Sequence, residues 1–266
     1  MKKSALQSLL AFGVFAATFV SPALAATDWS ANFGGCAQGT IASAGNWSSS
    51  LNASCPLEQG GVDVKAGAIA WSSSASPSNA AVVSYGTSGL GVISSLDSGA
   101  TGSHAIDNIG LMDSLVLKFS EDVAMNNVKV GWNATDSGTN NSSGSYYDSD
   151  LAVLAWVGAD PGDNAKPLDL TPWSGWQLVA KVPNIGSLSG NQASFSNGGI
   201  TSSYWMIAAY TSGDYCADAF KLLAVAGTKS DTTTPPGNQV PEPASLALLG
   251  AVAVGLGLSR RRRQGA

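Results

Sequence analysis

The sequence predicts an all-β protein, an antiparallel β-sandwich of jelly-roll type, and three observations indicate this fold. Short apolar segments recur along the chain, and turns rich in Gly, Asn, Asp and Ser separate them. Between the two chain ends, no amphipathic segment of helical period is longer than two turns. No internal repeat is visible, so one sandwich domain accounts for the pattern.

The strongest strand candidates differ in how they are patterned. They are residues 114–119, 128–132, 151–157, 204–210 and 220–226. In the first of these, Leu115, Leu117 and Phe119 alternate with other residues and therefore share one face. The last three are more uniformly apolar, which predicts central strands buried on both faces. Weaker candidates are residues 62–65, 68–71, 81–85, 91–93, 176–182 and 193–195.

Residues 1–25 have the composition of a secretory signal peptide. Lys2 and Lys3 precede an apolar core at 9–20, and the small residues at 23–25 suit signal peptidase. We expect cleavage after residue 25, which places the mature domain in an oxidising compartment.

Three cysteines, Cys36, Cys55 and Cys216, allow three different single disulfides, and each leaves one thiol over. We favour Cys36 with Cys55, because this pair closes the shortest loop in a segment rich in Gly and Ser. A disulfide to Cys216 is the alternative, since the strand order can bring the chain ends together.

The charge of the exported part excludes one class of function. Residues 26–239 contain seven lysines, no arginine and seventeen acidic residues, a net charge of −10. A basic surface for nucleic acid is therefore excluded. Within this part we expect a sandwich domain at 26–227 and an extended linker rich in Thr and Pro at 228–239.

The C-terminal residues 240–266 carry the clearest functional signal. They comprise Val240, Pro241, Glu242 and Pro243, an uncharged apolar segment at 244–258, and then Arg260, Arg261, Arg262 and Arg263. An apolar helix followed by arginines is a membrane-retention signal whose basic end stays in the cytoplasm. Fifteen residues with three glycines make a marginal transmembrane helix.

This tail resembles the PEP-CTERM sorting signal of bacterial surface proteins in its motif, its order and its position. The resemblance implies that an exosortase in the inner membrane recognises the motif and removes the tail. The product would then be a protein of the cell surface or the extracellular space. A permanent single-pass anchor is the alternative.

A second resemblance covers residues 85–227. The matching segments are 89–92, 103–108, 113–119, 131–132, 148–151 and 214–221. They look like a family of exosortase-dependent surface proteins. This resemblance supports export and implies no catalytic residue.

His104 is the only histidine, which excludes sites that need two imidazoles, including most zinc sites. We interpret the segment 103–108 as a turn in which Asp107 and Asn108 bond local backbone amides and His104 packs at the sheet rim. The alternative is a catalytic His104 with a serine and a carboxylate. No Gly-x-Ser-x-Gly elbow is present to support it.

Calcium is the cofactor that the sequence best accommodates. Asp136, Asp148 and Asp150 flank a loop of Ser, Asn and Gly, and Asp160 and Asp163 share one tight turn. Such oxygen-rich settings suit hard cations. Asp is also common in ordinary turns, and no EF-hand loop is present, so we expect no cofactor, with calcium at Asp148, Asp150, Asp160 and Asp163 as the alternative.

Two tryptophans are candidates for contact with a glycan. Trp173 and Trp176 follow a proline in a predicted loop, where an exposed ring stacks well on a sugar. Packing in the core is the alternative for both.

Together these features predict a non-enzymatic surface or matrix protein that acts through adhesion or association with exopolysaccharide. Its expected partners during export are signal peptidase, exosortase and the inner membrane. The alternative is a secreted carbohydrate-active or other hydrolytic enzyme on a jelly-roll scaffold. A glycoside hydrolase needs two converging carboxylates, and the sequence does not show which acidic residues converge.

Overall fold

The computed structural model describes residues 27–55, 61–71, 76–97, 104–134, 147–162, 164–171, 173–210 and 217–229. The expected signal peptide, linker and sorting signal and Cys216 lie outside these residues. In the described ranges, no helix is both long and apolar enough to cross a bilayer.

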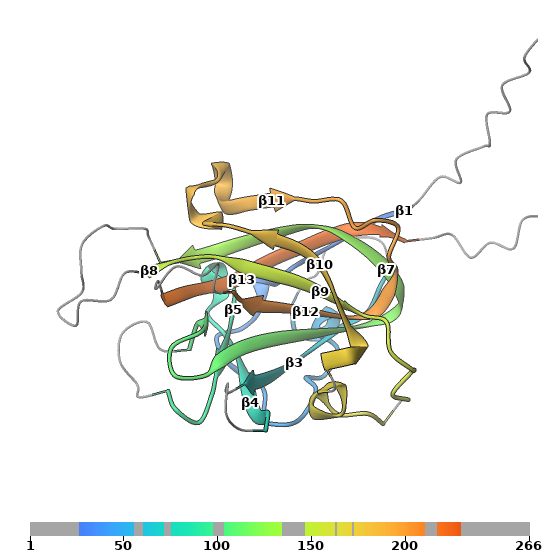
Figure 1. Ribbon diagram of the computed structural model, residues 1–266, viewed down its shortest axis with the longest axis horizontal. Coiled ribbons are helices and arrows are strands. Elements are labelled where there is room, and N and C mark those ends of the chain that lie inside the picture. The colour runs from blue at the N-terminus through green and yellow to red at the C-terminus, as the bar shows by residue number, and fades with distance from the viewer. Residues whose placement is uncertain are drawn as a thin grey trace, which may run out of the picture.

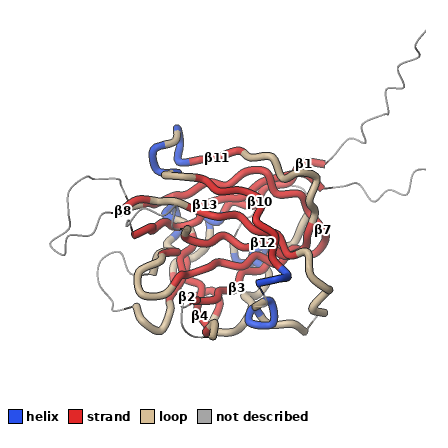
Figure 2. The backbone as a smooth tube through the Cα atoms, in the orientation of Figure 1, coloured by secondary structure: helices blue, strands red, loops and turns tan. Residues whose placement is uncertain are grey.

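The described residues form an all-β fold, as the sequence predicts (Figures 1 and 2). The strands are β1 (Thr27–Asn32), β2 (Gly39–Ala42), β3 (Val64–Trp71), β4 (Ser78–Ser84), β5 (Leu90–Ile93), β6 (Ile106–Asp107), β7 (Met112–Asn133), β8 (Tyr147–Asp148), β9 (Leu151–Trp156), β10 (Trp176–Val182), β11 (Gln192–Ser194), β12 (Ser202–Ala209) and β13 (Ala217–Lys229). The helices are α1 (Leu51–Ser54) and the 3-10 helices η1 (Phe33–Gly35), η2 (Gly86–Ser88), η3 (Pro167–Leu170), η4 (Trp173–Gly175), η5 (Ile185–Ser187) and η6 (Ser189–Asn191).

Strand β7 organises the sheet because its 22 residues serve two sets of neighbours. Its first half pairs with β3 and β12, and its second half pairs with β13 and β11, in each case antiparallel. Figure 1 shows β7 curving around one edge of the molecule between these halves.

This double pairing makes the sheet barrel-like. The strand order is β1-β13-β5-β4-β3-β7-β12-β9-β10, and the added pairing of β13 with β7 closes a ring. The sheet is therefore continuous, whereas a jelly-roll sandwich would have two separate sheets. The sheet is continuous because residues 120–127, which separate the predicted strands 114–119 and 128–132, continue β7 instead of forming a turn.

A close approach of two backbones permits the closure. The pairing of β13 with β7 shifts register beside Gly227, and a Cβ at Gly227 would collide with the carbonyl oxygen of Ala124. A glycine is needed here for the two strands to stay in contact.

The main core lies inside the ring, and a second cluster lies on the outer face of the central strands. In β9, Leu151 and Val153 face the main core, whereas Ala152 and Leu154 face the second cluster. Strand β12 alternates in the same way, which confirms that these strands are buried on both faces.

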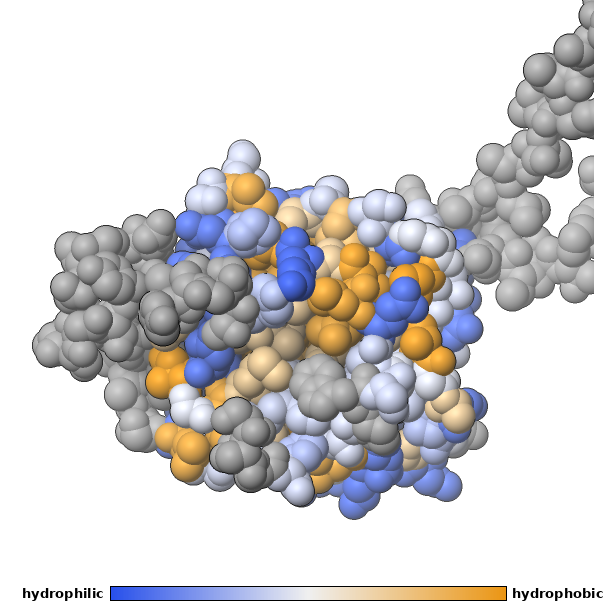
Figure 3. Space-filling model, viewed as in Figure 1, coloured by the Kyte–Doolittle hydropathy of each residue, from blue (hydrophilic) through white to orange (hydrophobic). Residues whose placement is uncertain are grey.

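The second cluster is rich in aromatic residues. It comprises Ile69, Trp71, Val116, Ala152, Leu154, Leu170, Trp176, Tyr204, Met206 and Ala208, with Trp47, Met112, Trp156, Leu168 and Tyr210 partly buried against it. Figure 3 shows apolar residues gathered on the face that carries β9, β10 and β12.

A disulfide joins Cys36 to Cys55, which is the pair that the sequence favours. Both cysteines are buried and belong to the main core. The bond fastens the segment between β1 and β3, where regular structure is sparse.

Candidate functional site

Two groups of three aspartates are the most unusual chemical feature of the described residues. The first cluster is Asp97, Asp107 and Asp113, and the second cluster is Asp148, Asp150 and Asp218. In each cluster, the carboxylate oxygens lie within 4.8 Å of one another. Carboxylates are rarely buried without a partner, so each cluster requires a physical explanation.

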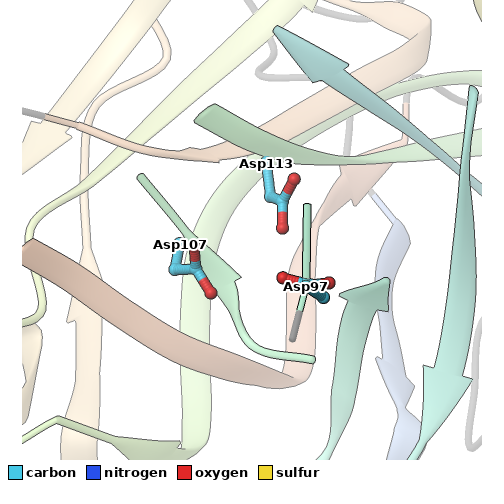
Figure 4. A group of neighbouring side chains, drawn as sticks. All are labelled: Asp97, Asp107 and Asp113. Carbon is cyan, nitrogen blue, oxygen red and sulfur yellow. The ribbon is translucent and has the colours of Figure 1, made fainter. Parts of the chain in front are cut away.

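Three separate segments bring the first cluster together (Figure 4). Asp97 lies in the turn after β5, Asp107 ends β6, and Asp113 lies near the start of β7. The Ser94 N–H donates to Asp97 Oδ2 at 2.7 Å, and the Ile109 N–H donates to Asp107 Oδ1 at 2.9 Å. These local bonds are the turn chemistry expected for Asp107.

Asp113 has no such support. Its side chain is completely buried, and neither carboxylate oxygen has a hydrogen-bond partner of normal geometry among the described residues, although the nearby Ser94 hydroxyl favours its charged form. Burial raises the pKa of Asp113 to about 9, and the charges of Asp107 and Asp97 act in the same direction. Burial likewise raises the pKa of Asp107 to about 7, against the effect of the Ile109 N–H.

His104 stands beside this cluster in a left-handed conformation, with a φ of 74°. Its carbonyl oxygen fills the place where any Cβ at Gly91 would lie, which explains the glycine in β5. His104 Nδ1 is buried without a hydrogen-bond partner and lies 3.9 Å from Asp97 Oδ2. The histidine therefore lies in the turn before β6, next to Asp97.

Lys221 is a buried cation that interacts with Asp107 of the first cluster. Lys221 on β13 places its Nζ 4.0 Å from the ring centre of Trp132 and 4.7 Å from that of Tyr85. Burial lowers the pKa of Lys221, and the charge of Asp107 opposes that effect. The ammonium is held by aromatic faces and by the negative charge of the cluster.

Hydrogen bonds occupy most of the second cluster. Asp218 accepts from the Asp150 N–H at 2.7 Å and from Asn108 Nδ2 at 2.7 Å, while Asp150 accepts from the Asn184 N–H at 2.6 Å. Only Asp148 Oδ1 is buried without a partner in this cluster.

The contact between Asp148 and Asp218 affects the protonation of Asp218. Burial raises the pKa of Asp218 to about 9, with contributions from the hydrogen bond and the charge of Asp148. Two neighbouring carboxylates cannot both ionise cheaply in a buried setting, so one of them keeps its proton at neutral pH.

The two clusters lie on opposite faces of the short pair β6 and β13. Asp107 is opposite Ala219 in this pair, and the next residue, Asn108, bonds Asp218. Successive residues of a strand point to opposite faces. The expectation that Asn108 bonds a local amide is therefore wrong, because its Oδ1 accepts from the distant Asp218 N–H at 2.9 Å.

The expected calcium ligands separate into two places. Asp148 and Asp150 converge, and the structure adds Asp218 to them. Asp160 is exposed, accepts from the Gly162 N–H at 2.9 Å, and belongs to neither cluster. Asp163 and Asp136 lie outside the described residues. Of the two settings that the sequence suggested, the structure therefore brings together the pair Asp148 and Asp150.

The two candidate glycan tryptophans also differ. Trp176 is only 8% exposed, donates its indole N–H to the Leu170 carbonyl at 2.6 Å, and packs edge-on against Trp156 at 5.3 Å. It belongs to the core, so the interpretation of Trp176 as a glycan contact is wrong. Trp173 begins η4, and its side chain lies outside the described residues.

Comparison with known proteins identifies one region. Residues 239–263 match the family model of the PEP-CTERM protein-sorting motif. This match confirms the sorting signal expected from the sequence, and it indicates exosortase-dependent processing of an exported protein. No curated protein matches the chain.

Proposed function

We propose that this chain is a non-enzymatic protein of the bacterial surface or extracellular matrix, delivered by the sorting motif and acting through adhesion to polysaccharide. The motif at residues 239–263 carries the proposal, because it links the chain to export and exosortase. Cleavage by signal peptidase and loss of the C-terminal tail are part of the proposal.

The aromatic face supports a polysaccharide ligand. Trp47, Trp156 and Tyr210 are partly exposed and pack over the second core cluster. The Trp156 indole N–H donates to the Ala159 carbonyl at 2.9 Å, which fixes the ring at the end of β9. Rings fixed in this way stack on sugars with little loss of side-chain entropy.

The carboxylate clusters support a structural role over a hydrolytic one. Asp113 and Asp218 are fully buried, and a catalytic carboxylate must reach the bond that it cleaves. Burial is the largest cause of the raised pKa values of Asp113 and Asp218.

Binding to purified bacterial exopolysaccharides tests the proposal. We expect the parent protein to bind and Trp156→Ala to weaken binding about 10-fold, which corresponds to about 1.4 kcal/mol. Trp132→Ala is the matched control. Trp132 lies in the second half of β7, where it packs over Lys221, so we expect this variant to bind polysaccharide like the parent.

Two outcomes would reject the adhesion proposal. One is the absence of binding to any polysaccharide from the producing cells. The other is turnover of polysaccharide that is lost in Asp107→Asn, which would favour the hydrolytic alternative. Intact mass measurement of the protein from the producing cells tests the processing separately, because it reads both termini.

A further inference from the structure

We propose that the first cluster binds a calcium ion, which fastens the turn after β5, strand β6 and the start of β7 to one another. The proposal stands apart from adhesion and from sorting, because it rests only on Asp97, Asp107 and Asp113 and their surroundings.

The unpartnered carboxylate of Asp113 is the first observation that points to a ligand. The side chain is fully buried, both oxygens lack a hydrogen-bond partner of normal geometry among the described residues, and they face the carboxylates of Asp97 and Asp107 (Figure 4). An unpaired buried carboxylate is strongly unfavourable, and a bound cation is one of the few ways to compensate it.

The spacing of the oxygens fits calcium. Each residue offers one oxygen, and these atoms lie within 4.8 Å of one another. Calcium holds its ligands at about 2.3–2.6 Å, so ligands on opposite sides of the ion lie about 4.6–5.2 Å apart. The three oxygens therefore fit within a single coordination sphere.

The charge also fits a divalent cation. Lys221 is the buried ammonium that interacts with Asp107, and it compensates one of the three carboxylates. His104 lies 3.9 Å from Asp97, and Tyr85 also interacts with Asp97. A bound cation favours the ionised form of the other two carboxylates, and their two negative charges match a divalent ion.

The ligand type selects a hard cation. Three aspartate oxygens and no cysteine surround the space, and His104 is the only imidazole in the chain. Zinc sites use several nitrogen or sulfur ligands, whereas calcium takes oxygens and waters. Magnesium holds ligands at about 2.0–2.1 Å in near-ideal octahedra, which a rigid set of three strand and turn carboxylates satisfies less easily.

The second cluster provides the contrast. There both oxygens of Asp218 and one of Asp150 already accept hydrogen bonds. Backbone and amide donors thus compensate this cluster, whereas the nearby Ser94 hydroxyl is the donor that the described residues offer to Asp113. The two clusters thus make a matched pair for an experiment.

Calorimetric titration of CaCl2 into the whole chain, purified in mild detergent after treatment with EDTA, tests the proposal. We expect one saturable site per chain in the parent protein, with a rise in Tm when calcium is added. Asp113→Asn should weaken calcium binding at least about 100-fold, since loss of a ligand costs more than loss of its supporting partner. Asp148→Asn should bind calcium like the parent.

Folding of the variants is checked by their Tm in EDTA. Asp113→Asn should equal or exceed the parent there, because without the ion the raised pKa already keeps Asp113 protonated at neutral pH and the amide matches that neutral group. Absence of calcium binding by the parent at millimolar concentration would overturn the proposal, as would unchanged binding by Asp113→Asn. Loss of binding in Asp148→Asn alone would place the ion in the second cluster and would also overturn it.

Discussion

Asn108 and Asp218 bond each other twice although 110 residues separate them in the chain. Asn108 Nδ2 donates to Asp218 Oδ2 at 2.7 Å, and the Asp218 N–H donates to Asn108 Oδ1 at 2.9 Å. This reciprocal pair joins β6 to β13 at the boundary of both aspartate clusters. The pair supplies the buried Asp218 carboxylate with one of its hydrogen-bond donors.

Loss of this pair should be costly. Asn108→Ala removes both bonds and leaves a buried N–H and a carboxylate oxygen of Asp218 unpaired, so we expect a loss of about 2–4 kcal/mol in the free energy of unfolding. Urea unfolding measures it. Asn127→Ala is the control, because Asn127 bonds Ser194 at an exposed position and should cost about 0.5 kcal/mol or less. Equal costs for the two variants would contradict the importance of the pair.

The second cluster should make stability depend on pH. Because the pKa of Asp218 is raised to about 9, the folded protein keeps a proton that the unfolded chain releases above about pH 4. The free energy of unfolding should therefore fall as the pH rises from about 4 towards 9, and Asp113 and Asp107 of the first cluster, with pKa values raised to about 9 and about 7, add to this fall. Urea unfolding in EDTA at pH 5 and at pH 8 measures this fall.

Asp148→Asn should reduce this pH dependence. The amide removes the charge of Asp148 and can donate a hydrogen bond to Asp218, so the pKa of Asp218 should fall towards its ordinary value. A variant whose stability falls as steeply with pH as that of the parent would show that the second cluster is not the source.

The disulfide between Cys36 and Cys55 should stabilise the exported domain. The pair is 19 residues apart, and closure of a loop of that length contributes about 3 kcal/mol in the chain-entropy model. We expect Cys36→Ala together with Cys55→Ala to lose about that much, measured by urea unfolding without reductant. Peptide mapping of the parent without reductant should recover this pair, with Cys216 as a free thiol. A disulfide to Cys216 would contradict the structure.

The sorting motif should control the fate of the tail. Glu242→Ala, or deletion of the four arginines, should leave a longer species in the membrane or release uncut protein, because the segment 244–258 is marginal as a span. Wild type should lack the peptide that contains Arg260. Mass spectrometry of both forms measures this, and a mature wild-type protein that retains residues 246–258 would identify the tail as a plain anchor.

Periodicity was sufficient to predict the central strands. Leu115, Leu117 and Phe119 share the main core as their alternation indicates, and the uniformly apolar β9 and β12 are buried on both faces. Strand β1 was not predicted, because its polar residues hide the two buried positions Trp29 and Ala31.

Local sequence patterns could not predict the two aspartate clusters. Asp97, Asp107 and Asp113 were within one stretch of sequence, yet their burial follows from the pairing of β6 with β13, which is a long-range contact. Asp218 joins Asp148 for the same reason. A sequence shows that an aspartate is present, whereas only the tertiary pairing shows whether water or a carboxylate lies beside it.

The pairing of β1 with β13 has a consequence for export. Thr27 is opposite Lys229, so the first and last described strands lie side by side, and both β1 and the second half of β7 pair with β13. A chain that crosses a membrane from its N-terminus delivers β13 last, and contacts of such long sequence separation form slowly. Until β13 emerges, β1 and the second half of β7 expose their unpaired edges, which invite association with other chains. A tail that pauses in the membrane just after β13 keeps each molecule tethered during this interval, so that the sheet closes within one chain before release.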